Sequence, residues 1–149
     1  MPGQLNLFAG KRQRGRGPSH KLEFSLHVAV ADVLRRWQSP GWRWSHFPAG
    51  EWRHPGTAAR LQRMGLQVGW PDFILLAPRP PEGPLPFAGL DQRTHFLELK
   101  REGATLSNYQ HAFMEFCALN GYPYIWCDNF KDALHHLKAW GAVRASVRG

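Results

Sequence analysis

Apolar residues recur every three or four positions along four stretches of the chain, a spacing that places them on one face of an α-helix. These stretches are Ser19–Trp37, Thr57–Met64, Ser107–Leu119 and Asn129–Trp140. Ser19 and Ser107 are suited to cap the first and third helices, because a serine side chain accepts a hydrogen bond from a free helix amide. Gly65, Gly121 and Gly141 follow the other helix ends, where glycine commonly stops a helix.

Four shorter runs, rich in apolar, aromatic and β-branched residues, predict β-strands. They are Trp42–Phe47, Asp72–Leu76, Thr94–Lys100 and Tyr122–Cys127. Helical and strand segments follow one another along the chain, which favours an α/β fold with a mixed β-sheet flanked by helices.

The length and composition favour one folded domain with basic ends. The chain has 149 residues, of which 43% are hydrophobic, and this is enough to bury a core. We expect residues 1–18 to be a flexible basic arm, 19–141 to be the folded domain and 142–149 to be a short basic tail. The proline-rich segment 78–93 is expected to form a rigid, non-helical loop.

The charge of the chain indicates a polyanionic partner. Lys and Arg number 19 against 11 Asp and Glu, a net charge of +8 at pH 7 that favours nucleic acid as the partner. A generic basic protein kept soluble by its charge would have the same balance. Because the chain has no apolar run long enough for a membrane span, no secretory signal and only two cysteines, we expect a cytoplasmic protein.

The strand that ends in Phe96-Leu97-Glu98-Leu99-Lys100 carries the candidate chemistry. Side chains alternate along a strand, so Glu98 and Lys100 share one face while Leu97 and Leu99 point into the core. Asp72 opens the preceding strand. A glutamate and a lysine two positions apart also occur on ordinary solvated strands, so the pair by itself is weak evidence.

A metal site follows if these two strands pair. Asp72 and Glu98 would converge on one ion, and with the backbone carbonyl of Leu99 they would form an all-oxygen site that suits Mg²⁺ or Mn²⁺. Such an ion lowers the pKa of a bound water, which becomes the nucleophile. Lys100 can orient that water and stabilise negative charge in the transition state.

Several motifs along the chain carry a family resemblance. They are Glu23, Gly50-Glu51-Trp52-Arg53, Thr57–Gly65, Gly69-Trp70-Pro71-Asp72-Phe73, Phe96–Lys100 and Leu106-Ser107-Asn108-Tyr109-Gln110. Together they resemble the PD-(D/E)XK nuclease superfamily and, within it, the VRR-NUC (virus-type replication-repair nuclease) family.

The resemblance implies a nuclease-like core and a set of site residues. It implies that Asp72 and Glu98 bind metal, that Lys100 is catalytic, that Gln110 belongs to the site and that Glu23 completes the metal shell. Glu23 as a solvated helix residue is an equal alternative. The chain is similar to stand-alone, phage-type members, which are expected to act as homodimers on branched DNA, so a bacterial or phage-encoded protein is expected.

The resulting hypothesis is a Mg²⁺-dependent DNA endonuclease, selective for branched DNA such as a Holliday junction, that acts in replication, repair or recombination. Two alternatives remain open at this point. One is a non-catalytic DNA-binding adaptor that kept the fold, and the other is a restriction-type enzyme that cuts duplex DNA.

Basic residues outside the motif strands are candidates for phosphate binding. They are Arg53, Arg60 and Arg63 before the first motif strand, and Lys11, Arg12, Arg14 and Arg16 in the arm. A solvated basic face explains Arg60 and Arg63 equally well. The eight histidines show no metal-ligand spacing, and we expect none of them to be a ligand.

The start of the arm holds an apolar cluster that a polar tail does not need. Gln4, Leu5, Leu7 and Phe8 lie in a Gln-Leu-Asn-Leu-Phe pentapeptide, which resembles the Gln-Leu-x-Leu-Phe motif that docks bacterial replication and repair proteins on the sliding clamp. Packing of these residues on the chain's own domain is the alternative.

Overall fold

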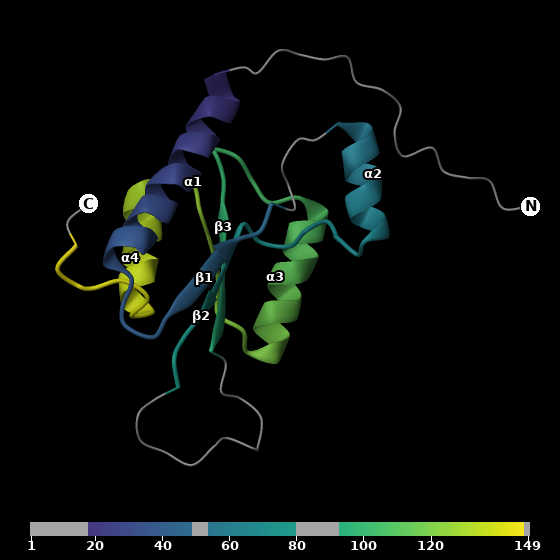
Figure 1. Ribbon diagram of the computed structural model, residues 1–149. Helices are drawn as coiled ribbons and strands as arrows, with labels where there is room; N and C mark the ends of the chain where they lie inside the picture. Colours follow the sequence, from purple (N-terminus) through teal and green to yellow (C-terminus); the bar gives the residue numbers. More distant parts are fainter. Residues whose placement is uncertain (1–17, 49–53, 80–92, 148–149) are drawn as a thin grey trace, which may run out of the picture.

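The computed structural model describes residues 18–48, 54–79 and 93–147, which form helices on both sides of a four-stranded sheet (Figure 1). The elements are α1 (Pro18–Trp37), β1 (Arg43–His46), α2 (Pro55–Arg63), β2 (Phe73–Leu76), β3 (Thr94–Leu99), α3 (Asn108–Asn120), β4 (Tyr124–Cys127) and α4 (Phe130–Ala139). The strands lie in the order β1-β2-β3-β4. The first three are antiparallel and β4 is parallel to β3, so the predicted α/β fold with a mixed sheet is confirmed.

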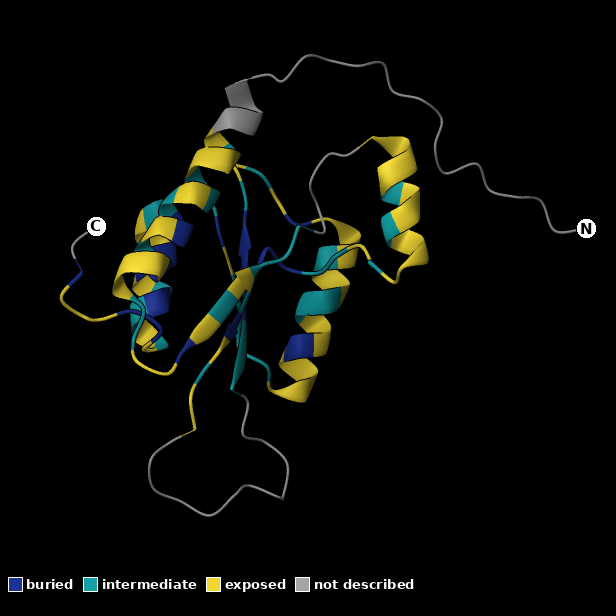
Figure 2. Ribbon diagram, viewed as in Figure 1, coloured by how far each residue is buried: buried dark blue, intermediate teal, exposed yellow. Residues whose placement is uncertain are grey.

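The main core lies between the sheet and the helix pair α1 and α4 (Figure 2). Its buried members from the helices include Val30, Leu34, Ala133, Leu134 and Leu137, and those from the sheet include Phe73, Leu75, Leu97 and Leu99. The prediction that Leu97 and Leu99 point into the core is confirmed, because both are fully buried.

A second, aromatic cluster joins the other face of the sheet to α3. Phe113 of α3 lies against Phe96 of β3 and Tyr124 of β4, with ring centroids 5.2 and 6.0 Å apart. Phe113 also contacts Trp70, which comes just before β2, at 5.2 Å. Because helices cover both faces of β3, its residues Phe96–Leu99 are all buried, as in the central strand of a three-layer sandwich.

The ends of α3 and the start of α4 follow local capping rules, and the start of α1 differs from the prediction. Ser107 caps α3 and Gly121 ends it in the left-handed conformation, as the sequence predicts. Asn129 caps α4 through its side chain. Ser19 lies inside α1, which begins at Pro18, so the expected serine cap there is wrong; proline is well suited to a first helical position because it has no amide hydrogen to satisfy.

Some sequence predictions fall outside the described residues. They concern the arm residues Gln4, Leu5, Leu7, Phe8, Lys11, Arg12, Arg14 and Arg16, the residue Arg53, and most of the proline-rich segment. In the described ranges, none of the helices has the length and apolar character needed to cross a membrane.

Candidate active site

Asp72 lies where the chain enters β2, directly opposite the end of β3. The antiparallel register pairs Phe73 with Leu97, and this register places Asp72 beside Glu98. The Leu99 amide donates a hydrogen bond of 2.8 Å to Asp72 Oδ2, so the carboxylate is tied to the backbone of the neighbouring strand. The convergence of Asp72 and Glu98 that strand pairing predicts is therefore present in the fold.

The turn before Asp72 requires a glycine. Gly69 has φ of +86°, in the left-handed region, and a Cβ atom built on it would lie 2.7 Å from the Tyr109 carbonyl oxygen. A side chain at this position would push the turn away from the start of α3. Gly69 thus allows the loop that carries Asp72 to pack closely against the helix that carries Gln110.

Glu98 is almost completely buried, with only 1% of its surface exposed. Its Oε1 atom forms an ion pair with Lys100 Nζ at 2.6 Å and accepts a hydrogen bond from Gln110 Nε2. Its Oε2 atom is also buried, and no hydrogen bond from the described residues reaches it. One oxygen of this carboxylate is held by two donors, while the other is open to a further partner.

Gln110 connects the helix cap to the site. Its backbone amide donates to the Ser107 hydroxyl, and its side-chain carbonyl accepts from the Ser107 amide, which forms a capping box. The side-chain NH₂ group then remains to donate to Glu98. The capping geometry of α3 therefore orients the amide that holds Glu98.

Burial and nearby charges raise the pKa of both acids. Desolvation raises the pKa of Asp72 to about 6, against the lowering effect of the Leu99 amide and of Lys100. Desolvation and the neighbouring Asp72 charge raise the pKa of Glu98 to about 7, and Lys100 opposes this. Two buried carboxyl groups in such a state are poorly compensated when both are ionised, and a divalent cation would compensate them.

Glu23 is a half-buried residue of α1 and lies near both acids. Its negative charge contributes to the raised pKa of Asp72 and of Glu98. The contact that the structure shows between Leu99 and Asp72 is made by the Leu99 amide, not by the carbonyl oxygen proposed as a metal ligand. The ligand roles of Glu23 and of the Leu99 carbonyl therefore stay predictions.

Arg60 and Arg63 lie at the end of α2, a helix with no buried residue. Both side chains are exposed to solvent. In Figure 1, α2 stands beside α3 on the side of the sheet away from α1 and α4. This placement is compatible with phosphate binding and equally with a solvated basic face. Both alternatives from the sequence analysis therefore stay open.

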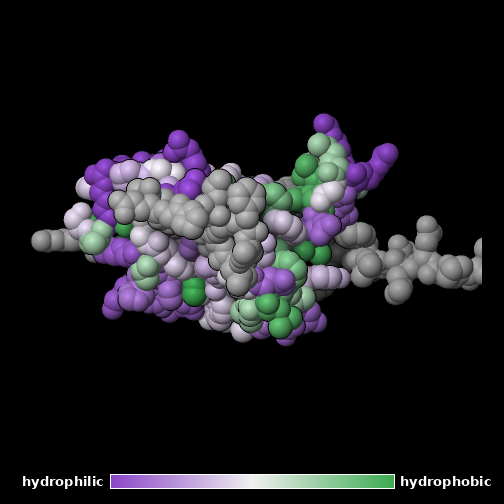
Figure 3. Space-filling view, turned by 90° about the horizontal axis from the view of Figure 1, so that it is seen from below, coloured by the Kyte–Doolittle hydropathy of each residue, from purple (hydrophilic) through white to green (hydrophobic). Residues whose placement is uncertain are grey.

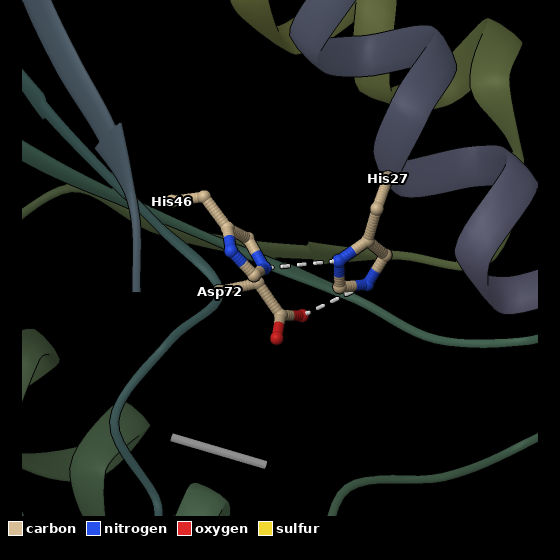
Figure 4. A group of neighbouring side chains, drawn as sticks. All are labelled: His27, His46 and Asp72. Atoms are coloured by element: carbon tan, nitrogen blue, oxygen red, sulfur yellow. Dashed lines mark hydrogen bonds and ion pairs between the residues drawn. The ribbon is translucent and has the colours of Figure 1, made fainter. Parts of the chain in front are cut away.

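Two histidines for which the sequence predicts no role lie against Asp72 (Figure 4). His27 Nε2 lies 3.6 Å from Asp72 Oδ2, and His27 Nδ1 lies 3.3 Å from His46 Nε2. One ligand atom from each of the three residues falls within 4.8 Å of the others. The expectation that no histidine is a metal ligand considered only their spacing along the chain and stays a prediction, while the fold brings two of them beside Asp72.

The sequence held only part of the signal for these histidines. His27 follows Glu23 by four residues, which places both on one face of α1. His46 ends β1, and the register pairs it with Phe73, next to Asp72. Three separate elements therefore bring the group together, and sequence spacing alone does not reveal such an arrangement.

The side chains present fit a divalent cation. Asp72 and Glu98 offer carboxylate oxygens, the ligands that Mg²⁺ and Mn²⁺ prefer. The buried Glu98 Oε2 atom, which no described residue satisfies, is the kind of atom that a bound cation satisfies. Lys100 Nζ lies 2.6 Å from the same carboxylate and adds a positive charge to the site.

Comparison with known proteins assigns the family. Residues 28–130 match the VRR-NUC domain, a range that holds Asp72, Glu98, Lys100 and Gln110. The chain belongs to the VRR-NUC family. The resemblance predicted from the sequence is thereby confirmed, and the protein contains a nuclease-like domain that acts on DNA. VRR-NUC nucleases are metal-dependent in general.

A solved structure shares the fold of this VRR-NUC domain. It is described as a "VRR_NUC domain protein" and superposes with a TM-score of 0.56 at 20% sequence identity, covering 79% of this chain and 86% of that chain. No curated protein sequence matches the chain significantly. The structural likeness supports the fold, while the family assignment rests on the sequence match.

The raised pKa values predict a pH-dependent stability of the metal-free protein. Each acid is harder to ionise in the folded protein than in the unfolded chain, so it contributes to stability while it is protonated. That contribution is fully present below the ordinary pKa, 3.8 for Asp72 and 4.5 for Glu98. It is lost as the pH rises through about 6 for Asp72 and about 7 for Glu98. In EDTA, wild-type protein should melt at lower temperature at pH 8 than at pH 5. Glu98→Gln should melt higher than wild type at pH 8, and this advantage should shrink at pH 5.

The matched control is Glu115→Gln on the exposed surface of α3, which should keep the wild-type pH profile. Addition of Mg²⁺ at pH 8 should stabilise wild type more than Glu98→Gln. Melting curves that show the same pH profile for wild type and Glu98→Gln would contradict the description of Glu98 as a poorly compensated acid.

Proposed function

We propose that this protein is a divalent-metal-dependent endodeoxyribonuclease whose catalytic residues are Asp72, Glu98 and Lys100. The observation that carries the proposal is the pair of adjacent buried carboxyl groups with a lysine ammonium 2.6 Å from one of them. Such a pair lowers the stability of the metal-free fold, and a domain that only binds DNA has no need of it.

Asp72 and Glu98 would hold a Mg²⁺ ion, or Mn²⁺ in its place, with the Leu99 carbonyl and Glu23 as further oxygen ligands. When bound, the ion supplies a coordinated water of lowered pKa and neutralises charge on the phosphate. The Leu99 amide keeps Asp72 in position, and Gln110 does the same for Glu98. These contacts leave each acid with an oxygen that the described residues do not engage.

Lys100 would act on the phosphate and on the attacking water. Its backbone amide donates to the Cys127 carbonyl at 2.8 Å, which extends the pairing of β3 with β4 and holds the residue at the end of the strand. Its ammonium group already lies in the site, 16% exposed. It can therefore stabilise negative charge that develops on the phosphate oxygens without a large movement.

The DNA surface is proposed to include the basic side chains outside the site. They are Arg60 and Arg63 on α2, Arg53 before it, and Lys11, Arg12, Arg14 and Arg16 in the arm. A net charge of +8 supports binding that is salt-sensitive and largely independent of sequence. The proposed substrate is branched DNA, including Holliday junctions, in replication, repair or recombination.

Alanine substitution tests the catalytic assignment. Asp72→Ala, Glu98→Ala and Lys100→Ala should each lower the cleavage rate by at least about 100-fold, because each removes charge stabilisation from the reaction, while DNA binding persists. The measurement is cleavage of labelled duplex, flap, splayed and four-way DNAs with Mg²⁺ or Mn²⁺, against EDTA. Glu115→Ala and Lys131→Ala, both exposed, are the matched controls.

The double variant Arg60→Ala/Arg63→Ala should lose DNA affinity, in contrast to the site variants, which should lose cleavage and keep DNA binding. Its affinity for DNA should fall and its salt dependence should flatten by about 0.9 per lost phosphate contact. Cleavage that survives in all three site variants would remove the active-site assignment. Binding of every substrate without any cleavage by wild type would indicate an adaptor, and sequence-dependent cutting of plain duplex would indicate a restriction-type enzyme.

A homodimer is proposed because one small domain offers one site, whereas a four-way junction must be cut on two strands. Exposed apolar side chains support self-association. In the view from below, the larger hydrophobic areas lie on the right, the side of α2 and α3 (Figure 3). Leu119 of α3 is 87% exposed and Met64, which follows α2, is 72% exposed. Sedimentation at micromolar concentration should show a dimer, and a strict monomer that still cuts both junction strands together would contradict it.

Docking on a bacterial sliding clamp is proposed for the arm. Leu5, Leu7 and Phe8 can fill an apolar pocket with Gln4 at its rim, and the glycine-rich stretch that follows gives reach. A synthetic peptide of residues 1–11 should bind such a clamp weakly, and the double change Leu7→Ala/Phe8→Ala should abolish binding. Calorimetry at high peptide concentration measures this, and no heat of binding for the unchanged peptide would exclude the proposal.

A further inference from the structure

The histidine pair beside Asp72 differs in chemistry from the carboxylate site. His27 comes from α1, His46 from the end of β1 and Asp72 from the entry to β2, and their polar ends turn toward one another (Figure 4). Both rings pack on Phe73, with centroids 6.0 Å away for His27 and 5.2 Å for His46. Phe73 is fully buried, so its ring is a fixed surface against which the two imidazoles pack.

The spacing of the two rings suits a shared metal ion. Two nitrogens that each lie about 2.0–2.1 Å from a tetrahedral ion are about 3.3–3.4 Å apart. His27 Nδ1 and His46 Nε2 are 3.3 Å apart. The remaining member, Asp72, offers Oδ2 at 3.6 Å from Nε2, the other ring nitrogen of His27. One ligand atom from each of the three residues lies within 4.8 Å of the others, so an ion that takes one nitrogen from each ring and one Asp72 oxygen draws these atoms closer by rotation of the side chains.

The donor types select the class of metal. Imidazole nitrogen suits borderline transition-metal ions such as Zn²⁺ and Co²⁺, whereas Mg²⁺ prefers oxygen ligands and keeps its water. Two imidazoles and one carboxylate leave coordination positions for water, and the side chains are partly exposed, so an ion can enter. This donor set is thus unlike the pair formed by Asp72 and Glu98.

Asp72 can serve both places because its two oxygens are engaged differently. Oδ2 accepts from the Leu99 amide and faces His27, whereas the other oxygen points away from the histidines (Figure 4). In the described part of the chain, no hydrogen bond engages that second oxygen. It remains for an ion shared with Glu98.

We propose that His27, His46 and Asp72 form a second cation site, for a divalent transition metal of the Zn²⁺ and Co²⁺ type, that shares Asp72 with the carboxylate site. The protein would then bind two chemically different cations on the two sides of one aspartate. This proposal requires no DNA cleavage, and it stands or falls separately from the nuclease function.

The test is a Co²⁺ titration of the full chain followed by visible absorption, since nitrogen ligation and low coordination number give Co²⁺ a stronger and shifted spectrum than six oxygen ligands. Wild type should give the nitrogen-ligated spectrum. His27→Ala and His46→Ala should each weaken Co²⁺ binding by at least roughly 10- to 100-fold. Loss of a residue that only supports a metal ligand already has an effect of this size. Glu98→Gln should keep the spectrum, because it changes only the carboxylate site.

The matched control is His95→Ala, which removes another half-buried histidine, packed between Trp42 and Trp140. It should leave Co²⁺ binding unchanged. Stabilisation of His27→Ala and His46→Ala by Mg²⁺ in melting curves would show that these variants fold and keep the carboxylate site. If wild type gains no stability from Mg²⁺ yet gives the nitrogen-ligated Co²⁺ spectrum, the metal chemistry of the proposed nuclease fails while the histidine site stands.

A second measurement needs no variant. In nitrogen-15 spectra of wild type labelled at histidine, added Zn²⁺ should shift the ring nitrogens of two histidines before the others. The proposal is overturned if Zn²⁺ shifts no histidine selectively, if wild-type Co²⁺ has only an oxygen-ligated spectrum, or if folded His27→Ala and His46→Ala bind Co²⁺ as wild type does.

Discussion

Two carboxyl groups lose most of their water where the antiparallel strands β2 and β3 pair, and much of the surrounding structure compensates this loss. Asp72 accepts a hydrogen bond from the Leu99 amide. Glu98 forms an ion pair with Lys100 and accepts a hydrogen bond from Gln110. The compensation is incomplete, since the pKa of both acids stays raised, to about 6 and about 7. A site of this kind favours a cation, because the positive charge of the surrounding protein does not balance two ionised carboxylates. A divalent ion supplies that positive charge.

The helices place the site as much as the sheet does. Gln110 uses one end of its side chain to cap α3 and the other to hold Glu98, so a local helix signal and a distant strand residue are coupled. The aromatic contact between Trp70 and Phe113 fixes the entry to β2 against the same helix. Gly69 permits this close approach because any side chain there would meet the Tyr109 backbone. Displacement of α3 would therefore disturb both acids together.

The side of Asp72 that faces α1 has a separate chemistry. There Asp72 Oδ2 faces imidazoles, whereas the neighbouring Glu98 contacts an ammonium and an amide. Phe73 packs against both imidazole rings. One aspartate thus lies between an oxygen-rich environment and a nitrogen-rich environment. Such a boundary allows the two sides to differ in metal preference, since hard ions select oxygen and borderline ions accept imidazole.

The sequence by itself determined the local features: the strand that carries Glu98 and Lys100, the serine cap at Ser107, and the family motifs. These depend on neighbours within a few residues, where spacing along the chain equals proximity in space. It did not determine that Gln110 donates to Glu98, that the Leu99 amide holds Asp72, or that His27 and His46 meet beside it. Those contacts join α1, β1, β2, β3 and α3, and only the packing of helices on the sheet decided them, because residues far apart in sequence become neighbours when a common core is buried.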